Sequence, residues 1–287
     1  MPSEIERIAP YLRRVLAPNP GPMTLQGTNT WVVGEPAQGG SMVVDPGPAT
    51  ARHQEAIWAA GAGRIAAVVL THRHLDHAES AGALAERAGC GVRAADPQLQ
   101  VGSAGLVDRE TFEVGGCEVE VVATPGHTSD SCSLLVSGLD GQKRLLTGDT
   151  VLGQGTTVIT HPDGDLGHYL DSLARLEGLV RERAVVEILP GHGPVVTDPA
   201  ATLAAYTQHR RARLDQVRAA LLAGDRTTAD VVARVYADVD RSLWPAAEQS
   251  VRAQLRYLQR ERAVPVLPAT SSEAHRPGTD SAGTLEP

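Results

Sequence analysis

The chain has 287 residues, of which 42% are hydrophobic, and a formal net charge of −8 at pH 7. This length accommodates one large domain or two unequal ones with a sizeable core, and the negative charge argues against a chain-wide surface for binding a polyanion. Three cysteines without a CxxC pair argue against a disulfide framework or a thiolate metal site. The sequence shows no basic-then-apolar leader and no apolar run of membrane-spanning length, so we expect a cytoplasmic protein without membrane contact.

Short apolar runs separated by turns rich in Gly and Pro predict strands and amphipathic helices over the first 200 residues. Strands are expected at residues 8–16, 31–33, 41–44, 66–71, 91–95, 111–114, 118–124, 132–136, 144–147 and 184–189. Helices are expected at residues 51–60, 77–88 and 165–180. From residue 198 to about 262 the pattern is helical, with segments at 203–222, 227–236 and 245–262. This order predicts a sheet sandwich flanked by helices, followed by an all-helical end.

The stretch VVLTHRHLDHAES, residues 68–80, carries the strongest chemical signal. An apolar run that reads as a strand is followed within six residues by His72, His74, Asp76 and His77, and then by a helical pattern. His72 and His74 are two apart, so they point to the same side of an extended chain. These side chains suit a cation that prefers nitrogen and oxygen donors, with zinc the leading candidate and Mn²⁺ or Fe²⁺ also admissible. A polar loop that is rich in histidine by chance is the alternative, and it explains this strand-to-helix context less well.

Three more candidate ligands come directly after a strand and a glycine: His127, Asp149 and His192. Glycine allows sharp turns and close backbone approach at such positions. Strand ends along one edge of a sheet converge, so these side chains can meet the first four in space. Seven ligands are too many for one tetrahedral zinc with an open position, and they suit two metals that share a bridging ligand.

The motif THRHLDH, followed in order by PGH, GD and GHG, resembles the pattern of the metallo-β-lactamase superfamily. The resemblance implies an αββα sandwich that binds two Zn²⁺ per chain. It also implies the ligand sets: His72, His74 and His127 for one metal, Asp76, His77 and His192 for the other, and Asp149 as the bridge. A hydroxide between two cations would be the nucleophile. Asp76 is the expected catalytic residue, because it could orient that hydroxide and handle its proton.

Three further motifs resemble the β-lactamase-like protein 2 family, whose mitochondrial member is a single-strand endoribonuclease: NPGPMTLQGTNT at residues 19–30, GDTVLGQGTTV at 148–158 and PGHGPV at 190–195. The resemblance implies a catalytic domain at residues 1–202 and a linking helix with a winged-helix-like domain at 203–267. We expect Thr228 to cap a helix of that domain and residues 263–267 to form a wing or short strand. The tail at 268–287 is predicted to be disordered, and a homo-oligomer is compatible with the sequence.

Two functions compete for this metal site. The first is a phosphodiesterase or endoribonuclease that acts on single-stranded RNA. The alternative is a thioester hydrolase of the glyoxalase II or acyl-carrier kind, because both reactions need a hydroxide beside a polarised oxygen. A non-catalytic nucleic-acid-binding module is disfavoured by the seven ligands. A lactamase ranks last, because Asp149 stands where a thiolate type would have Cys and because no export signal is present.

Residues outside the ligand set should select the substrate. We expect Asn29 and Thr30 to contact the substrate, although residues 24–30 could equally be a turn that uses Asn29 for backbone geometry. Residues 153–158 could donate backbone N–H groups to an oxyanion, or only route the chain past the metals. Residues 203–262 carry 11 Arg against 7 Asp plus Glu, a hint of nucleic-acid affinity that a solvated helix face also explains. His53 and His209 are interpreted as surface residues.

Overall fold

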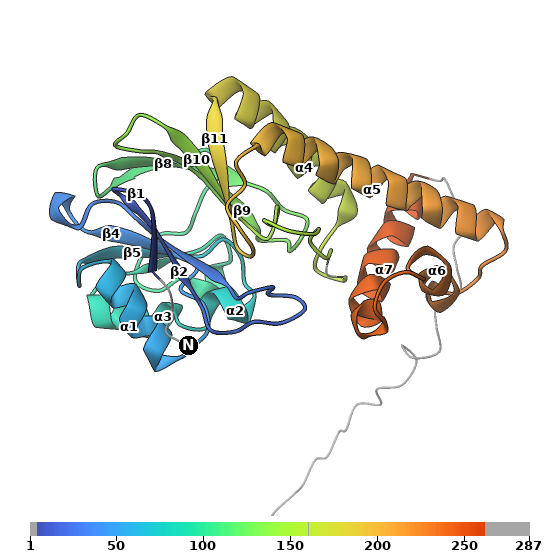
Figure 1. Cartoon of the computed structure of the whole chain (residues 1–287), viewed down its shortest axis with the longest axis horizontal. Helices are drawn as coiled ribbons and strands as arrows, with labels where there is room; N and C mark the ends of the chain where they lie inside the picture. Colours follow the sequence, from blue (N-terminus) through green and yellow to red (C-terminus); the bar gives the residue numbers. More distant parts are fainter. Residues whose placement is uncertain (1–4, 160, 262–287) are drawn as a thin grey trace, which may run out of the picture.

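Two β-sheets stack face to face with helices on both outer faces, as the computed structural model shows for residues 5–159 and 161–261 (Figure 1). One sheet has the strand order β1-β2-β3-β4-β5-β6, and the other has the order β11-β10-β9-β8-β7. Helices α1 and α3 cover the first sheet, and α4 and α5 pack against β11 of the second. The predicted αββα sandwich is therefore confirmed.

The strands of the first sheet are β1 Ile5–Ala9, β2 Leu12–Leu16, β3 Asn29–Val33, β4 Ser41–Val44, β5 Ile65–Val69 and β6 Val92–Arg93. Those of the second are β7 Thr111–Val114, β8 Cys117–Ala123, β9 Cys132–Ser137, β10 Lys143–Gly148 and β11 Val185–Pro190. The flanking helices are α1 Ala51–Ala60, α2 Leu75–Ala78, α3 Ala81–Ala88, α4 Leu166–Arg183 and α5 Pro199–Leu222. Every residue of β3 and β4 is buried, because these strands are covered on both faces.

Two elements differ from their sequence prediction. One edge strand was expected at residues 8–16, whereas residues 5–16 form the hairpin β1-β2. The helix expected at residues 77–88 is divided into α2 and α3. Ser80 lies at the division, where its backbone N–H donates to the carbonyl of Gly47 at 3.1 Å and its hydroxyl donates to the carbonyl of Pro48 at 2.8 Å. These tertiary hydrogen bonds replace helical ones and turn α2 toward the end of β4.

The C-terminal part consists of α5, α6 Thr228–Val235 and α7 Trp244–Arg260, which pack against one another beside the sandwich (Figure 1). Helix α6 is capped by Thr227 and not by Thr228 as expected. Thr227 Oγ1 accepts from the N–H of Asp230 at 3.1 Å, and the Asp230 carboxylate accepts from the N–H of Thr227 at 3.0 Å. The expected wing at residues 263–267 and the tail at 268–287 lie outside the described residues. Within the described part of the chain, no helix has the length and apolarity needed to cross a membrane.

Candidate metal centre

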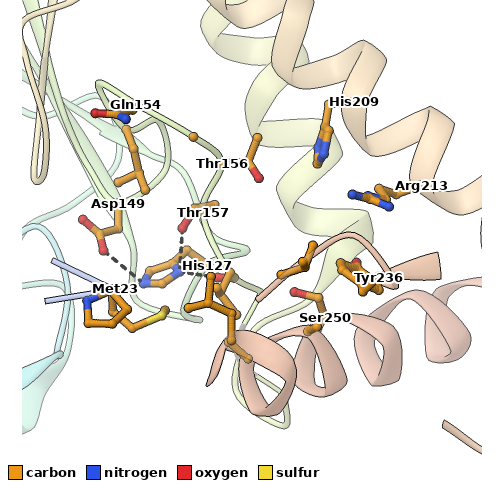
Figure 2. Close-up of a pocket in the computed structure, with 18 of the residues that line it drawn as sticks. Met23, His127, Asp149, Gln154, Thr156, Thr157, His209, Arg213, Tyr236 and Ser250 are labelled. Carbon is orange, nitrogen blue, oxygen red and sulfur yellow. Dashed lines mark hydrogen bonds and ion pairs between the residues drawn. The ribbon is translucent and has the colours of Figure 1, made fainter. Parts of the chain in front are cut away.

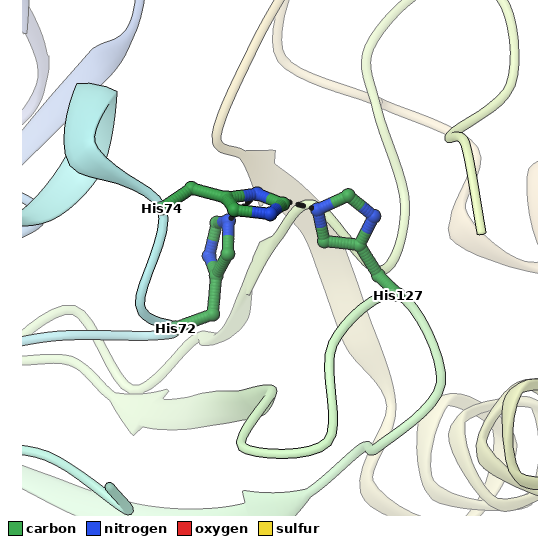
Figure 3. A group of neighbouring side chains, drawn as sticks. All are labelled: His72, His74 and His127. Carbon is green, nitrogen blue, oxygen red and sulfur yellow. Dashed lines mark hydrogen bonds between the residues drawn. The ribbon is translucent and has the colours of Figure 1, made fainter. Parts of the chain in front are cut away.

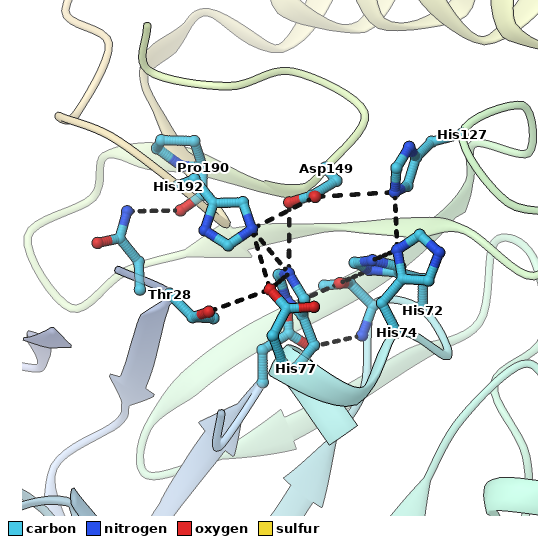
Figure 4. A network of polar contacts seen from close by, with 12 residues as sticks. Thr28, His72, His74, His77, His127, Asp149, Pro190 and His192 are labelled. Carbon is cyan, nitrogen blue, oxygen red and sulfur yellow. Dashed lines mark hydrogen bonds and ion pairs between the residues drawn. The ribbon is translucent and has the colours of Figure 1, made fainter. Parts of the chain in front are cut away.

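The seven predicted ligands meet at one edge of the sandwich, where strands from both sheets end (Figure 4). His72 follows β5 of the first sheet by a few residues, and His74, Asp76 and His77 lie on the loop and the short helix α2 that come next. His127, Asp149 and His192 follow β8, β10 and β11 of the second sheet. The convergence of strand ends that the sequence predicted is therefore present.

Glycines make this convergence sterically feasible. A Cβ atom on Gly191 would lie 2.5 Å from Asp149 Oδ1 and 2.8 Å from His77 Cε1. A Cβ atom on Gly148 would lie 2.3 Å from Thr71 Oγ1, and Gly148 also has a left-handed φ of 48°. Only a residue without a side chain allows such close approach.

Three imidazoles form the first half of the centre (Figure 3). His74 Nδ1 lies 3.0 Å from His72 Nε2 and 3.1 Å from His127 Nε2. His72 and His127 are buried, whereas His74 is partly open to solvent. Three ring nitrogens that face one point match a His₃ metal site with an open position.

The second half combines two imidazoles with a carboxylate. His192 Nε2 lies 3.2 Å from His77 Nε2 and 3.2 Å from Asp76 Oδ2. Asp149 lies between the halves: its Oδ2 is 3.4 Å from His192 Nε2 and 3.7 Å from His127 Nε2, and its Oδ1 is 3.4 Å from His77 Nε2. A carboxylate that lies between two ligand groups in this way can be shared by two cations (Figure 4).

Four of the imidazoles are held in a fixed orientation by a hydrogen bond at Nδ1, the ring nitrogen that faces away from the centre. His127 Nδ1 donates to the carbonyl of Val158 at 2.6 Å, and His192 Nδ1 donates to the carbonyl of Gly27 at 3.2 Å. The same arrangement holds His72 through the Thr71 hydroxyl at 3.0 Å and His77 through the Asp45 carboxylate at 3.0 Å. Each of the four therefore turns Nε2 toward the centre, as metal-binding histidines do when a second group holds the other nitrogen.

Asp45 is the functional residue that the sequence analysis missed. Its buried carboxylate accepts from the N–H of Thr71 at 2.8 Å, from the Thr71 hydroxyl at 2.7 Å and from His77 Nδ1 at 3.0 Å. Because the Thr71 hydroxyl uses its one proton on Asp45, it accepts from His72 Nδ1. One carboxylate thus orients an imidazole of each half. The signal was present, since Asp45 directly follows the strand β4, but it reads equally well as the start of the turn DPGP.

Burial and charge divide the centre into two electrostatic environments. Burial lowers the pKa of His127 to about 4 and holds the pKa of His72 well below its ordinary value. Burial also opposes the charge on His192, but Asp149 and Asp76 outweigh it and raise the pKa of His192 to about 10. For Asp76, burial is outweighed by the hydrogen bond with His192 and the charge of His77, and the pKa falls to about 2. The first half is therefore neutral, and the second half consists of paired charges.

This donor set fits metal ions. Asp149 Oδ1 is buried and accepts no hydrogen bond from the described residues. A buried carboxylate oxygen in that state is costly unless a cation faces it. A cation would also give a common partner to the ring nitrogens that face each other at 3.0–3.2 Å.

Asn29 and Thr30 do not reach the open side of the centre, where we expected them. Both side chains are fully buried. Asn29 Nδ2 donates to the carbonyls of Pro190 and Gly193 at 3.0 and 2.8 Å, and the Thr30 hydroxyl donates to the carbonyl of Asp45 at 2.7 Å. This favours the alternative interpretation, in which the stretch supports backbone geometry. It braces the loops that carry His192 and Asp45.

Residues 153–158 hold the side chain of a predicted ligand, a role that neither interpretation of the sequence included. The carbonyl of Val158 and the hydroxyl of Thr157, at 3.1 Å, both contact His127 Nδ1. The segment thus positions a predicted ligand. It also lines a cavity of about 270 Å³ beside the metal centre (Figure 2).

The cavity runs from His127 and Asp149 to the C-terminal helices. Its other walls come from residues 22–25 and from α5, the segment after α6, and α7. His209 lies in this wall and is half-buried, so its interpretation as a surface residue holds in part. The same interpretation is wrong for His53, which is fully buried and contacts the Thr30 hydroxyl at 2.9 Å.

Comparison with known proteins agrees with this architecture. The Metallo-beta-lactamase superfamily profile matches residues 23–192, and the Beta-lactamase associated winged helix domain profile matches residues 227–266. A metallo-beta-lactamase family protein from Thermus thermophilus has the same fold, with a TM-score of 0.75 and 22% identity over 90% of this chain and 96% of that one. The chain belongs to the metallo-β-lactamase superfamily, a family of metal-dependent hydrolases, and carries the associated winged-helix domain.

Two kinds of relative cover most of the chain. A beta-lactamase-like protein 2 homolog from Caenorhabditis elegans is 31% identical over 91% of this chain and 88% of its own length. An atrochrysone carboxyl ACP thioesterase from Aspergillus fumigatus is 34% identical over 76% of this chain and 67% of its own length. The predicted resemblance to the β-lactamase-like protein 2 family is confirmed.

Proposed function

We propose that this protein is a hydrolase of acyl thioesters that works with two zinc ions. His72, His74 and His127 would hold one ion, Asp76, His77 and His192 the other, and Asp149 would bridge them. Bound there, the metals would supply an activated water and polarise the substrate carbonyl. Asp76 is the catalytic residue: its side chain is 31% exposed, the most open of the three groups in its half, and can orient the attacking water.

The observation that carries the choice of substrate is the lining of the cavity. Apolar side chains form much of its wall: Met23, Leu25, Leu152, Val158, Val239, Leu243, Ala246 and Ala247. Such a lining suits an acyl group, because burial of apolar surface binds it and leaves the thioester carbonyl at the metals. The similarity to acyl-carrier thioesterases supports the same substrate class.

Single-stranded RNA, the first hypothesis from the sequence, becomes the second candidate. It retains support from the similarity to β-lactamase-like protein 2 homologs. The basic excess of the C-terminal helices supports it less, because ion pairs use several of the arginines: Arg218 with Asp215, Arg234 with Asp225, Arg252 with Glu248 and Arg260 with Asp165, at 2.5–2.9 Å. RNA binding also favours stacking aromatics along a basic groove, whereas Tyr236 is the one Phe, Tyr or Trp among the described residues that line this cavity.

The proposed reaction is the hydrolysis of a thioester by one water molecule. The attacking water forms a C–O bond, the C–S bond breaks, and one proton passes to the departing thiolate. The products are a carboxylic acid and a thiol. Asp76 accepts a hydrogen bond from Thr28 Oγ1 at 3.2 Å, which holds the carboxylate in place as the proton moves.

The test is a parallel assay of the zinc-loaded protein. Acyl-CoA thioesters and S-lactoylglutathione are followed by thiol release, and labelled single-stranded RNA is followed by gel electrophoresis. We expect thiol release that is lost at least 100-fold in Asp76→Asn and retained in Asp171→Asn, which changes an exposed residue of α4. Cleavage of RNA without hydrolysis of any thioester would overturn the proposal in favour of the nuclease.

A further inference from the structure

Arg210 is a buried cation without an anion among the described residues. Its side chain lines the cavity from helix α5, and the residue is 3% exposed. One guanidinium N–H donates to the carbonyl of Thr157, and the group lies 5.1 Å from the centre of the Tyr169 ring. Its Nε has no hydrogen-bond partner, and no carboxylate of residues 5–159 or 161–261 pairs with it. A buried charge in this state is costly and indicates a missing counter-ion.

Two neighbours on α5 line the same part of the cavity. Arg213 lines the cavity one turn further along the helix, where it donates to the carbonyl of Val235 at 2.7 Å and forms no ion pair with the described residues. His209 also faces the cavity, and its buried Nδ1 lacks a hydrogen-bond partner there. Burial, followed by the charges of Arg210 and Arg213, lowers the pKa of His209 to about 4. These three groups offer donors to an anion.

The metal end of the cavity does not supply that anion. Among the described residues that line it, Asp149 is the one carboxylate, and Asp149 lies within 3.4 Å of His77 and His192. Elsewhere on the C-terminal helices, arginines such as Arg218 and Arg234 pair with carboxylates. Arg210 and Arg213 have no such pair among the described residues, and both line the cavity, where Figure 2 shows Arg213 beside His209.

We infer that Arg210, Arg213 and His209 form a subsite for a carboxylate on the acyl group, so that the preferred substrates are thioesters of dicarboxylic acids. This inference rests on the proposed thioester hydrolysis and specifies its substrate class. The apolar wall holds the body of the acyl group between the metals and the subsite. A charge-assisted bidentate hydrogen bond from an arginine gives such a carboxylate both affinity and orientation.

The experiment compares two substrates of equal chain length, the glutaryl and pentanoyl thioesters of N-acetylcysteamine. Neither thiol part carries a phosphate, so the acyl carboxylate is the one added anion. We expect the zinc-loaded protein to favour the glutaryl thioester at least tenfold in kcat/KM. Arg213→Gln should lower this ratio to about one, and Arg213→Lys should retain part of it. Arg211→Gln, which changes an exposed arginine beside the subsite, should keep the full ratio.

A binding measurement separates failure of the subsite from failure of the proposed function. Glutarate and pentanoate each offer one carboxylate to the metals, and only glutarate offers a second one to the arginines. By calorimetry we expect glutarate to bind at least tenfold more tightly, and this difference to vanish in Arg213→Gln. Equal binding or equal hydrolysis of the two compounds would overturn the subsite. Tighter glutarate binding without hydrolysis of either thioester would support the subsite and contradict the thioesterase.

Discussion

Asp45 shows how one residue outside the ligand set can control two metal positions. Its carboxylate reaches His77 directly and His72 through the Thr71 hydroxyl. We predict that Asp45→Asn weakens zinc binding 10- to 100-fold, because the amide cannot accept all three hydrogen bonds. A competitive chelator titration measures this change, and Asp171→Asn, on the surface of α4, is the control. Unaltered zinc affinity in Asp45→Asn would show that the two imidazoles are held without it.

Gly191 marks the place where the metal centre leaves no room for a side chain. In Gly191→Ala, the added methyl group would lie 2.5 Å from Asp149 Oδ1 and 2.8 Å from His77 Cε1. Both groups must move, so we predict loss of at least one of the two proposed metals, measured as zinc per chain by mass spectrometry. Gly178→Ala provides the matched control, because nothing lies within 4 Å of its Cβ position in α4. Two zinc ions per chain in Gly191→Ala would contradict the prediction.

His53, which is outside the proposed ligand set, makes the free energy of unfolding depend on pH. Burial lowers the pKa of His53 to about 4, whereas a histidine in the unfolded chain titrates near 6.5. The unfolded chain therefore binds more protons between these values, and stability falls as the pH drops below about 6.5 toward 4. We predict that the wild type loses about 2 kcal/mol more than His53→Gln between pH 7.5 and pH 5. Urea unfolding in the presence of EDTA measures the difference, and identical losses would contradict it.

Among the elements, strand β10 connects the second sheet to the β1-β2 hairpin of the first through Arg144. The guanidinium group is buried and donates to Asp140 at 2.9 Å, to Glu187 at 2.7 Å and to the hydroxyl of Tyr11. Tyr11, between β1 and β2, also donates to Asp140 at 2.9 Å. The network therefore joins the sheets at the edge formed by the β9–β10 turn.

We predict that Arg144→Met lowers the free energy of unfolding by about 3 kcal/mol, because it removes the buried cation that two carboxylates face. Urea unfolding measures this loss. Arg183→Met removes an exposed arginine whose pair with Glu120 spans 3.5 Å, and it should cost less than about 1 kcal/mol. Similar losses in the two variants would show that the Arg144 network contributes no more than a surface pair.

On the scale of the whole molecule, the metal centre joins the two halves of the sandwich. Its groups follow β5 in one sheet and β8, β10 and β11 in the other. Metals bound there would crosslink the sheets and stabilise only the folded state. At free zinc 1,000 times the dissociation constant each ion contributes about 4 kcal/mol, so removal of both metals should lower the melting temperature by roughly 15–20 °C. Scanning calorimetry before and after chelation, with zinc added back, tests this; an unchanged melting temperature would contradict it.

The sequence by itself determined the local chemistry of this protein. Strand-end motifs such as THRHLDH identified seven metal-binding candidates, because ligand type and spacing are properties of short segments. The alternation of apolar runs and turns predicted most strands within a few residues, as for β4 and for the β7-β8 hairpin. It failed at Ser80, where hydrogen bonds to Gly47 and Pro48 outweigh helix propensity.

Only the tertiary structure decided which polar residues face the metals and which face the backbone. Asn29 and Thr30 looked available in the sequence, but packing buries them, and their hydrogen bonds are made with distant segments. Asp45 contacts Thr71 and His77, which are more than 20 residues away, and no local pattern encodes these contacts. Burial and long-range contact are set by how the sheets and helices pack. For that reason the chemistry of the candidate site could be predicted from the sequence, whereas the shape and charge of the substrate cavity could be described only from the fold.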